Sequence, residues 1–245
     1  MNQGKKLIIL GPCSVESLEQ MTKVTNLLCQ LELPYLRTQL FKPRTNPESF
    51  QGLGVEGIPY LEKLKSIYPK IKFVMEVGSL EQLTLLAPHA HVLQIGARNM
   101  QNFELLKVVG KFLRPHHDFV LLKRGFASTF EEWMSSARYL IQSGVPKNKI
   151  ILCERGSRSL TSPTGVQLDF LSALMAKDQG YQVIGDPSHG TKKSAFVIPM
   201  AKAILAAGLD GLMMECHPDP KNSVSDAAQA LSLEETQTFI RSLDV

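Results

Sequence analysis

Eight short apolar segments, each followed by a stretch with helical periodicity, divide the chain into repeated strand–helix units. The segments span residues 6–10, 35–41, 72–77, 92–95, 119–122, 149–152, 182–184 and 211–214. Most of them do not alternate apolar and polar residues, which is typical of parallel strands whose outer face is covered. Eight such units in 245 residues predict a closed (β/α)8 barrel, the TIM barrel, as a single domain over residues 1–245.

The stretches between the apolar segments carry their own helix signals. Thr129-Phe130-Glu131-Glu132 has the capping-box pattern, and it predicts a helix that begins after Thr129 and ends near Gln142. Further helices are expected over residues 58–67, 80–86 and 103–112. Neither a GxGxxG nor a GxxxxGK[ST] motif is present in the sequence, which argues against a nucleotide-binding open sheet.

Composition excludes several classes of function. The 27 basic and 23 acidic residues give a formal charge of only +4, and the charges are scattered, so no nucleic-acid partner is expected. No apolar run approaches the roughly 18 residues of a membrane span, and no signal-peptide pattern occurs at the N-terminus. The four cysteines show no disulfide spacing. These features predict a cytoplasmic protein without a membrane partner.

Polar and ionisable residues gather where the predicted strands end. In a (β/α)8 barrel, functional groups lie at the carboxyl ends of the strands and in the loops that follow. Read in order, these ends carry Cys13, Arg37 with Lys42 and Arg44, Glu76, Arg98, Lys123, Arg155, His189 and Glu215. Cations gathered at one mouth repel each other and need anions nearby. The pattern therefore predicts phosphorylated, carboxylated substrates.

Four of the ionisable residues form a separate set of metal-type donors: Cys13, His189, Glu215 and Asp226. A thiolate, an imidazole and two carboxylates suit a catalytic divalent ion with mixed soft and hard preferences. Each residue alone has a commoner structural explanation, such as a buried cysteine or a hydrogen-bonded histidine. An arginine at a strand end could likewise pair with a rim carboxylate such as Glu154 or Asp186. Their coincidence at successive strand ends favours the functional interpretation.

Several longer motifs resemble one enzyme family in the same order along the chain. They are Gly11-Pro12-Cys13-Ser14, Phe41-Lys42-Pro43-Arg44-Thr45, Gln94-Ile95-Gly96-Ala97-Arg98-Asn99, Leu122-Lys123-Arg124-Gly125 and Asp186-Pro187-Ser188-His189-Gly190. With these motifs the chain resembles the 3-deoxy-D-arabino-heptulosonate 7-phosphate (DAHP) synthases, in particular the short type I-beta class without an added regulatory domain. The resemblance implies condensation of phosphoenolpyruvate with erythrose 4-phosphate, the entry step of the shikimate pathway. It also implies a homodimer or homotetramer.

The resemblance also assigns roles to the residues at the mouth. One divalent ion, such as Mn, Fe, Co or Zn, would be held by Cys13, His189, Glu215 and Asp226. Phosphoenolpyruvate would be bound by Arg37, Lys42, Arg98, Lys123 and Arg155, and the phosphate of erythrose 4-phosphate by Arg44 and Thr45. Lys42 and His189 are the expected proton-handling catalytic residues.

One segment departs from the family pattern. Where relatives usually read Arg-Gly-Gly, this chain has Arg37-Thr38-Gln39, which predicts a bulkier and less permissive backbone below the substrate loop. Three other functions stay open at this stage. They are a 3-deoxy-D-manno-octulosonate 8-phosphate synthase that uses arabinose 5-phosphate, a metal-free aldolase with a Lys123 Schiff base, and a phosphate-binding sensor without turnover.

Overall fold

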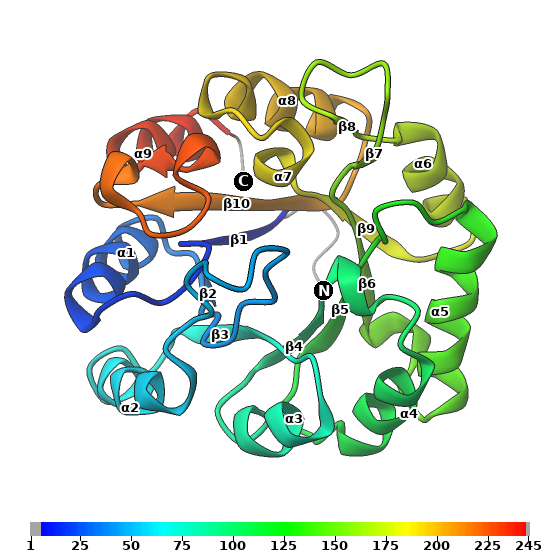
Figure 1. Ribbon diagram of the computed structural model, residues 1–245, viewed down its shortest axis with the longest axis horizontal. Helices are drawn as coiled ribbons and strands as arrows, with labels where there is room; N and C mark the ends of the chain where they lie inside the picture. The colour runs from blue at the N-terminus through cyan, green and yellow to red at the C-terminus, as the bar shows by residue number, and fades with distance from the viewer. Residues whose placement is uncertain (1–5, 244–245) are drawn as a thin grey trace.

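The computed structural model of the protein describes residues 6–243 and contains a closed ring of eight parallel strands. The first barrel strand, β1, pairs with the last, β10, so that Leu7 lies opposite Gly211 and the ring closes. Figure 1 shows these two strands side by side although they come from opposite ends of the chain. The barrel strands are β1 (Leu7–Gly11), β2 (Tyr35–Arg37), β3 (Lys72–Glu76), β4 (Val92–Ile95), β5 (Phe119–Lys123), β6 (Ile150–Glu154), β9 (Gln182–Gly185) and β10 (Gly211–His217). The predicted (β/α)8 barrel is confirmed.

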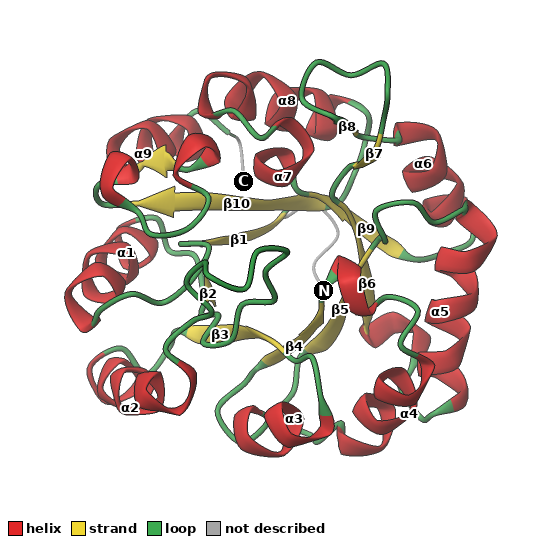
Figure 2. Cartoon of the chain, viewed as in Figure 1, coloured by secondary structure: helices red, strands yellow, loops and turns green. Residues whose placement is uncertain are grey.

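Helices surround the strand ring on its outer side, as Figure 2 shows in red around the yellow strands. The helix after β5 begins at a capping box in which Thr129 and Glu132 satisfy each other's backbone groups, as the sequence predicted. The helices are α1 (Leu18–Gln30), α2 (Ile58–Ile67), α3 (Leu80–Leu86), α4 (Phe103–Phe112), α5 (Phe130–Gln142), α6 (Phe170–Asp178), α7 (Pro187–Thr191), α8 (Ser194–Ala206) and α9 (Leu233–Arg241). None of these helices within residues 6–243 is long and apolar enough to cross a membrane.

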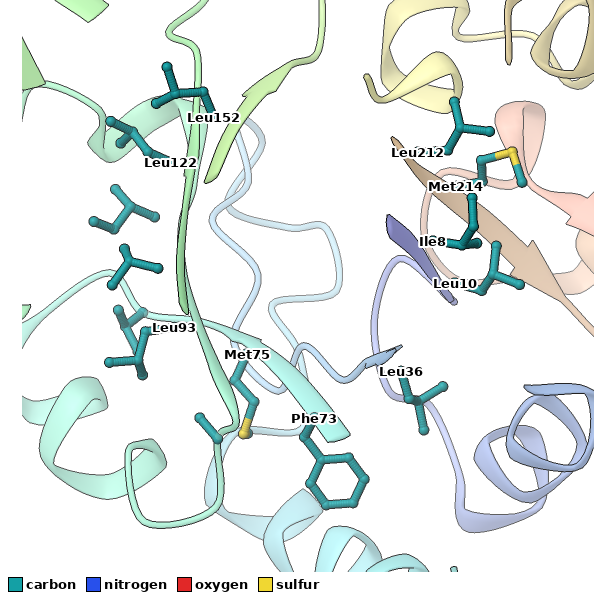
Figure 3. Close-up of a cluster of buried hydrophobic side chains, with 14 of the residues drawn as sticks. Ile8, Leu10, Leu36, Phe73, Met75, Leu93, Leu122, Leu152, Leu212 and Met214 are labelled. Atoms are coloured by element: carbon teal, nitrogen blue, oxygen red, sulfur yellow. The ribbon is translucent and has the colours of Figure 1, made fainter. Parts of the chain in front are cut away.

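Two apolar layers cover the strand ring, one inside the barrel and one between the ring and the helices. The inner layer includes Ile9, Val74 and Phe119, all fully buried. The outer layer lies between strands and helices, and Figure 3 shows part of it, including Phe73 and Leu122. Because successive side chains of a strand point to opposite faces, each strand contributes to both layers. Both faces of the strands are thus covered, which explains the continuous apolar runs in the sequence.

The second strand is shorter than predicted. The sequence pattern suggested a strand over residues 35–41, but β2 ends at Arg37. After it, the backbone oxygen of Gln39 accepts from the Val15 backbone N–H, and the Leu40 oxygen accepts from Gly54. The chain therefore leaves the barrel wall, and residues 38–53 form a loop beside the mouth instead of a longer strand.

The last barrel strand is longer than predicted, and two small pairings add to the mouth. β10 continues to His217, where it pairs with β11 (Leu231–Ser232) beyond the ring. A two-stranded hairpin of β7 (Ser157–Arg158) and β8 (Val166–Gln167) follows β6. Because all eight barrel strands run parallel, the residues after each of them meet at the same end of the barrel.

Candidate active site and metal centre

The four metal-type donors meet at the carboxyl end of the barrel. Cys13 follows β1, His189 lies in α7 after β9, Glu215 is part of β10, and Asp226 lies in the loop after β10. One donor atom from each lies within 4.8 Å of the others. The Nε2 atom of His189 is 3.5 Å from Glu215 Oε1 and 3.9 Å from Asp226 Oδ2. Residues separated by more than 200 positions in the sequence therefore form one cluster.

The protonation states of this cluster follow from its neighbours. Burial would raise the pKa of Glu215, but His189 and Arg37 outweigh it and hold that pKa below its usual range. Burial opposes ionisation of Asp226 as well, yet Lys42 lowers its pKa strongly. Burial lowers the pKa of His189 and favours the neutral imidazole. Two carboxylates and a neutral imidazole thus offer electron pairs at neutral pH.

The thiol of Cys13 behaves differently from the other three donors. Burial, aided by Glu215, raises its pKa well above the usual value, so the thiol is protonated and donates to Asp226 Oδ2 at 2.7 Å. Lys42 donates to the same sulfur through its Nζ atom. A divalent ion would favour the thiolate, because metal-bound thiols lose their proton.

Asp186 fixes the orientation of the His189 ring. It caps the N-terminus of α7 by accepting from the His189 backbone N–H at 3.0 Å, and its Oδ2 atom lies 2.8 Å from His189 Nδ1. The pKa of Asp186 lies well below the usual value, because His189 and Lys123 outweigh the effect of burial. An ionised carboxylate can only accept, so Nδ1 carries the proton and the Nε2 lone pair faces the cluster.

Glu215 has both carboxylate oxygens in hydrogen bonds. Arg37 donates Nη1–H to Oε1 at 2.6 Å, and Gln229 donates Nε2–H to Oε2 at 2.7 Å. The backbone N–H of Glu215 donates to Ser188 Oγ at 2.9 Å. Because Glu215 and Arg37 are each at most 2% exposed, their ion pair is shielded from solvent.

Asp226 reaches the cluster from a left-handed backbone conformation with φ of 53°. Aspartate tolerates this region better than most residues do. The loop is held by the Ser14 and Ser225 hydroxyls, 2.7 Å apart, and by Glu16, which accepts from Ser223 and from the Val224 backbone. Lys42 and Arg44 pair with the Asp226 carboxylate at 2.8 and 3.5 Å.

A cavity of about 790 Å³ opens above the cluster, and every cation predicted at the mouth lines it. Cys13 and Glu215 are buried, whereas His189 and Asp226 are partly exposed and contribute to the cavity wall. The cavity is lined by the predicted residues Arg37, Lys42, Arg44, Thr45, Arg98, Lys123 and Arg155.

These cavity residues lie at two depths. Arg37, Lys123 and Arg155 are at most 5% exposed and form the floor with Lys42. Thr45 and Arg98 are exposed at the rim and lie 3.1 Å apart, from Thr45 Oγ1 to Arg98 Nη2. An anion on the floor would be desolvated and held by charge-assisted hydrogen bonds, whereas one at the rim would keep part of its water.

Carboxylates of the protein neutralise several of the buried cations. Lys123 donates to Asp186 Oδ2 at 2.7 Å. The sequence analysis considered Asp186 as a partner for an arginine, but its partner here is this lysine. Burial would lower the pKa of Lys42, but the Glu215 and Asp226 carboxylates raise it, and the amine stays protonated. Glu154, the other rim candidate, pairs with Arg124 at 3.1 Å and with none of the predicted arginines.

Phe126 organises the opposite wall of the cavity, and the sequence analysis did not identify it. Arg98, Arg155 and Arg158 place their guanidinium carbons 5.1, 4.7 and 5.9 Å from the centre of its ring. Such cation–π contacts let cations approach one another without a carboxylate between them. Arg158, on β7, also lines the cavity and was missed, because a two-residue strand leaves no periodic signal.

Glu76 lines the cavity from the end of β3. Its Oε2 atom accepts from Gln94 Nε2 at 2.6 Å. The space beside it is available only because residue 96 is glycine, since a Cβ atom there would lie 2.0 Å from Glu76 Oε1. The sequence analysis placed Glu76 at a strand end but gave it no role. Asp186 and Gln229 were missed as supports of the cluster, because their contacts depend on tertiary structure.

The chemistry of the cluster fits a divalent metal ion. One sulfur, one imidazole nitrogen and two carboxylate oxygens match the ligand types of catalytic transition-metal sites. Two of these atoms, Cys13 Sγ and Asp226 Oδ2, already accept from the Lys42 ammonium, so the cluster attracts positive charge. His189 and Glu215 each have the supporting hydrogen bonds that metal ligands usually have.

Comparisons with known proteins show which family the chain resembles. A model described as the DAHP synthetase I family matches residues 2–244 of the chain. A Thermotoga maritima protein named phospho-2-dehydro-3-deoxyheptonate aldolase is 40% identical over 235 residues, which are 96% of this chain and 68% of that protein. A Helicobacter pylori protein named 2-dehydro-3-deoxyphosphooctonate aldolase is 29% identical over 267 residues, covering 96% of this chain and 93% of that protein.

Solved structures resemble the fold over almost its whole length. The crystal structure of the DAHP synthase from Thermotoga maritima superposes with a TM-score of 0.90 at 39% identity, covering 98% of this chain and 68% of that one. A truncated form of the same enzyme gives a TM-score of 0.87 at 37% identity, covering 98% of this chain and 85% of that one. The barrel is thus shared with enzymes of known activity.

Proposed function

Because the chain belongs to the DAHP synthetase I family, we propose that it condenses phosphoenolpyruvate with erythrose 4-phosphate and water. The products would be 3-deoxy-D-arabino-heptulosonate 7-phosphate and inorganic phosphate, as in the first step of the shikimate pathway. One observation carries the proposal. A cluster of four metal-type donors lies at the floor of a cavity lined by more than five cationic side chains.

The two depths of the cavity suggest where each substrate binds. Phosphoenolpyruvate has a carboxylate and a phosphate, and we assign it to the floor, where Arg37, Lys42, Lys123 and Arg155 can hold both groups. Arg98 would close over it from the rim. Arg44 and Thr45 line the cavity nearer solvent and would hold the phosphate of erythrose 4-phosphate.

Cys13, His189, Glu215 and Asp226 would hold the metal ion, for which Mn, Fe, Co and Zn are the candidates. When bound, such an ion supplies Lewis acidity toward the aldehyde oxygen of erythrose 4-phosphate. The protein's own contribution is orientation. Asp186 keeps the proton on His189 Nδ1, and Arg37 with Gln229 fixes the carboxylate plane of Glu215.

Lys42 and His189 are the residues we assign to proton handling. The Glu215 and Asp226 carboxylates raise the pKa of Lys42 against the effect of burial, so its ammonium can donate a proton or a hydrogen bond at neutral pH. His189 is neutral, with Nε2 directed at the cluster as a ligand, so the proton that it can exchange is the one on Nδ1, next to Asp186. The floor cations would stabilise the phosphate as it leaves.

A Schiff-base mechanism at Lys123 is disfavoured by its surroundings. The nucleophile of such an aldolase is a neutral amine, whereas Lys123 is 4% exposed and donates to the ionised Asp186 at 2.7 Å. Borohydride treatment in the presence of the keto product, 3-deoxy-D-arabino-heptulosonate 7-phosphate, should leave no covalent adduct on Lys123.

The octulosonate reaction with arabinose 5-phosphate is the second candidate, because relatives with that name align over most of the chain. Their identity of 28–29% is well below the 40% of the heptonate relative. The deciding assay follows phosphoenolpyruvate consumption and phosphate release with each aldose in turn, after chelator treatment and after metal is added back. Turnover with erythrose 4-phosphate that needs metal supports the proposal, and turnover only with arabinose 5-phosphate contradicts it.

We further propose a single catalytic domain, a homodimer or homotetramer, and a cytoplasmic location. Free cysteines at positions 13, 29, 153 and 216 support a reducing compartment. Exposed apolar side chains on α6, at Leu171 and Met175, support self-association. Light scattering on the purified protein measures the assembly size.

A further inference from the structure

Gln39 lies on the floor of the cavity, at the point where the chain leaves β2. It is 2% exposed and lines the cavity next to Arg37. Its backbone oxygen accepts from the Val15 N–H, so the segment that follows Cys13 holds the backbone of Gln39 in place. Sequence analysis treated this position only as a loss of glycine, yet the side chain faces the place where substrates would bind.

The orientation of the Gln39 amide is set by Arg37. The guanidinium has only donors, and its Nη2 atom lies 3.3 Å from Gln39 Oε1. The amide oxygen must therefore face Arg37, and the NH2 group points away from it. Within residues 6–243, Gln39 Nε2 is buried and has no hydrogen-bond partner. Because buried donors in proteins are nearly always paired, this donor is arranged for a group that binds in the cavity.

The neighbours of Gln39 indicate the chemistry of that group. Arg37, Lys42 and Lys123 make the floor strongly cationic, so an anionic oxygen is the acceptor expected beside the free N–H. Another cation at position 39 would add to the repulsion among these groups, whereas a neutral amide adds a donor without charge.

We propose that Gln39 is a substrate-binding residue, whose Nε2 donates a hydrogen bond to an anionic oxygen of phosphoenolpyruvate. This inference rests on the proposed function. We choose phosphoenolpyruvate as the ligand because Gln39 is buried beside Arg37, on the cavity floor. The residues assigned to erythrose 4-phosphate lie nearer solvent: Arg44 is partly exposed and Thr45 is exposed. The same amide holds Arg37 through its oxygen, so Gln39 links an arginine of the floor to the substrate.

The test measures binding of phosphoenolpyruvate by calorimetry, with manganese present and no aldose. Gln39→Met removes both ends of the amide and should weaken binding about tenfold, the loss expected for one hydrogen bond to a charged group. Gln39→Glu keeps an acceptor for Arg37 but has no donor, and it should weaken binding by more, about 100-fold, because a carboxylate also repels the anion.

The matched control is Thr38→Val. Thr38 is the buried neighbour, and its hydroxyl makes only a 3.4 Å contact with the Val74 oxygen. This variant should change the affinity for phosphoenolpyruvate by less than about twofold, since it alters the same segment without touching the cavity floor. Thermal melting and manganese binding of each variant show whether the barrel and the metal cluster are intact.

Two results would overturn the proposal. If Gln39→Met, which is neutral and has no donor, bound phosphoenolpyruvate as tightly as the unmodified protein, the Gln39 amide would have no part in binding it. A crystal structure of the unmodified protein with phosphoenolpyruvate is the second readout, and it does not depend on how the variants fold. Gln39 Nε2 within hydrogen-bonding distance of a ligand oxygen supports the inference, and its absence there refutes it. If the unmodified protein bound phosphoenolpyruvate but failed to turn over with erythrose 4-phosphate, only the proposed function would fail.

Discussion

Replacing Asp186 by asparagine tests how the metal cluster is held. Asp186 Oδ2 accepts from Lys123 Nζ at 2.7 Å and from His189 Nδ1 at 2.8 Å, and Oδ1 accepts from the His189 backbone at 3.0 Å. Asparagine can keep Oδ1 as the helix cap. Its NH2 group would then replace Oδ2 and face two donors, the Lys123 ammonium and the His189 ring N–H.

Two costs follow from this donor–donor conflict. Lys123 is 5% exposed in its side chain, so it loses its carboxylate in a place that water barely reaches, and breaking a buried pair costs about 3–5 kcal/mol. His189 can relieve the second conflict only by moving its proton from Nδ1 to Nε2. That nitrogen faces Glu215 and Asp226, and with a proton on it the imidazole cannot bind a metal ion there.

We therefore expect Asp186→Asn to lower the free energy of unfolding by about 3–5 kcal/mol and the metal affinity by about 10 to 100-fold. Urea titration measures the first quantity, and competition with a chelator measures the second. Nitrogen NMR of the metal-free variant should show the His189 proton on Nε2.

Asp169→Asn is the matched control, because Asp169, like Asp186, caps a helix, α6, and pairs with a cationic side chain, Arg124 at 2.8 Å. It lies outside the metal cluster, so it should lower stability by about 1 kcal/mol and leave metal affinity unchanged. If Asp186→Asn bound manganese as tightly as the unmodified protein, with Nδ1 still protonated, the proposed role of Asp186 would be wrong.

Three further substitutions test other parts of the structure. Cys13→Ser should lower metal affinity by more than about 100-fold in the chelator assay, because mutating a residue that only hydrogen-bonds to a metal ligand already lowers affinity by up to about 100-fold. Cys29 is exposed, and Cys29→Ser should leave the metal affinity unchanged. Gly96→Ala places a Cβ atom 2.0 Å from Glu76 Oε1 and should cost about 1–3 kcal/mol of stability in urea, most of which Glu76→Ala in the same chain should restore. Burial lowers the pKa of His117 to about 4, so between pH 6.5 and 4 the unfolded chain binds a proton that the folded chain does not. As pH is lowered across that window, the free energy of unfolding should decrease more steeply than in His117→Gln, by up to about 1.4 kcal/mol per pH unit. Parallel pH profiles of the two proteins would contradict this.

The sequence was sufficient to predict the barrel and most of the residues that the structure brings together at its mouth, for a topological reason. Short apolar strands that all run parallel must end on the same side, so the position of a residue after a strand already places it at the mouth. Cys13 and Lys123 were identified in this way. In the structure, Lys123 lines the cavity and Cys13 belongs to the cluster of metal-type donors. The helix after Thr129 was predictable because its capping box is a local pattern.

The residues that the sequence analysis missed act through side-chain contacts that no local pattern records. Asp186 precedes His189 in a recognisable motif, but its contact with Lys123 joins positions 63 residues apart. Phe126 carries no charge and gave no reason to expect three arginines around it. The end of β2 was misplaced for a similar reason. Leu40 and Phe41 are apolar and suggested that the strand continues, whereas in the structure the backbone oxygens of Gln39 and Leu40 accept from Val15 and Gly54, outside the barrel wall.

The charges of the site suggest how metal and substrate binding depend on each other. Glu215 and Asp226 hold Arg37 and Lys42 in ion pairs at 2.6 and 2.8 Å. With a metal ion bound, the ion would neutralise part of the negative charge of these carboxylates. Their electrostatic attraction to Arg37 and Lys42 would then be weaker. Arg37 and Lys42 would then have more positive charge available for phosphoenolpyruvate. Arg155, in contrast, forms no ion pair within residues 6–243, so it can meet the substrate whether or not the ion is present.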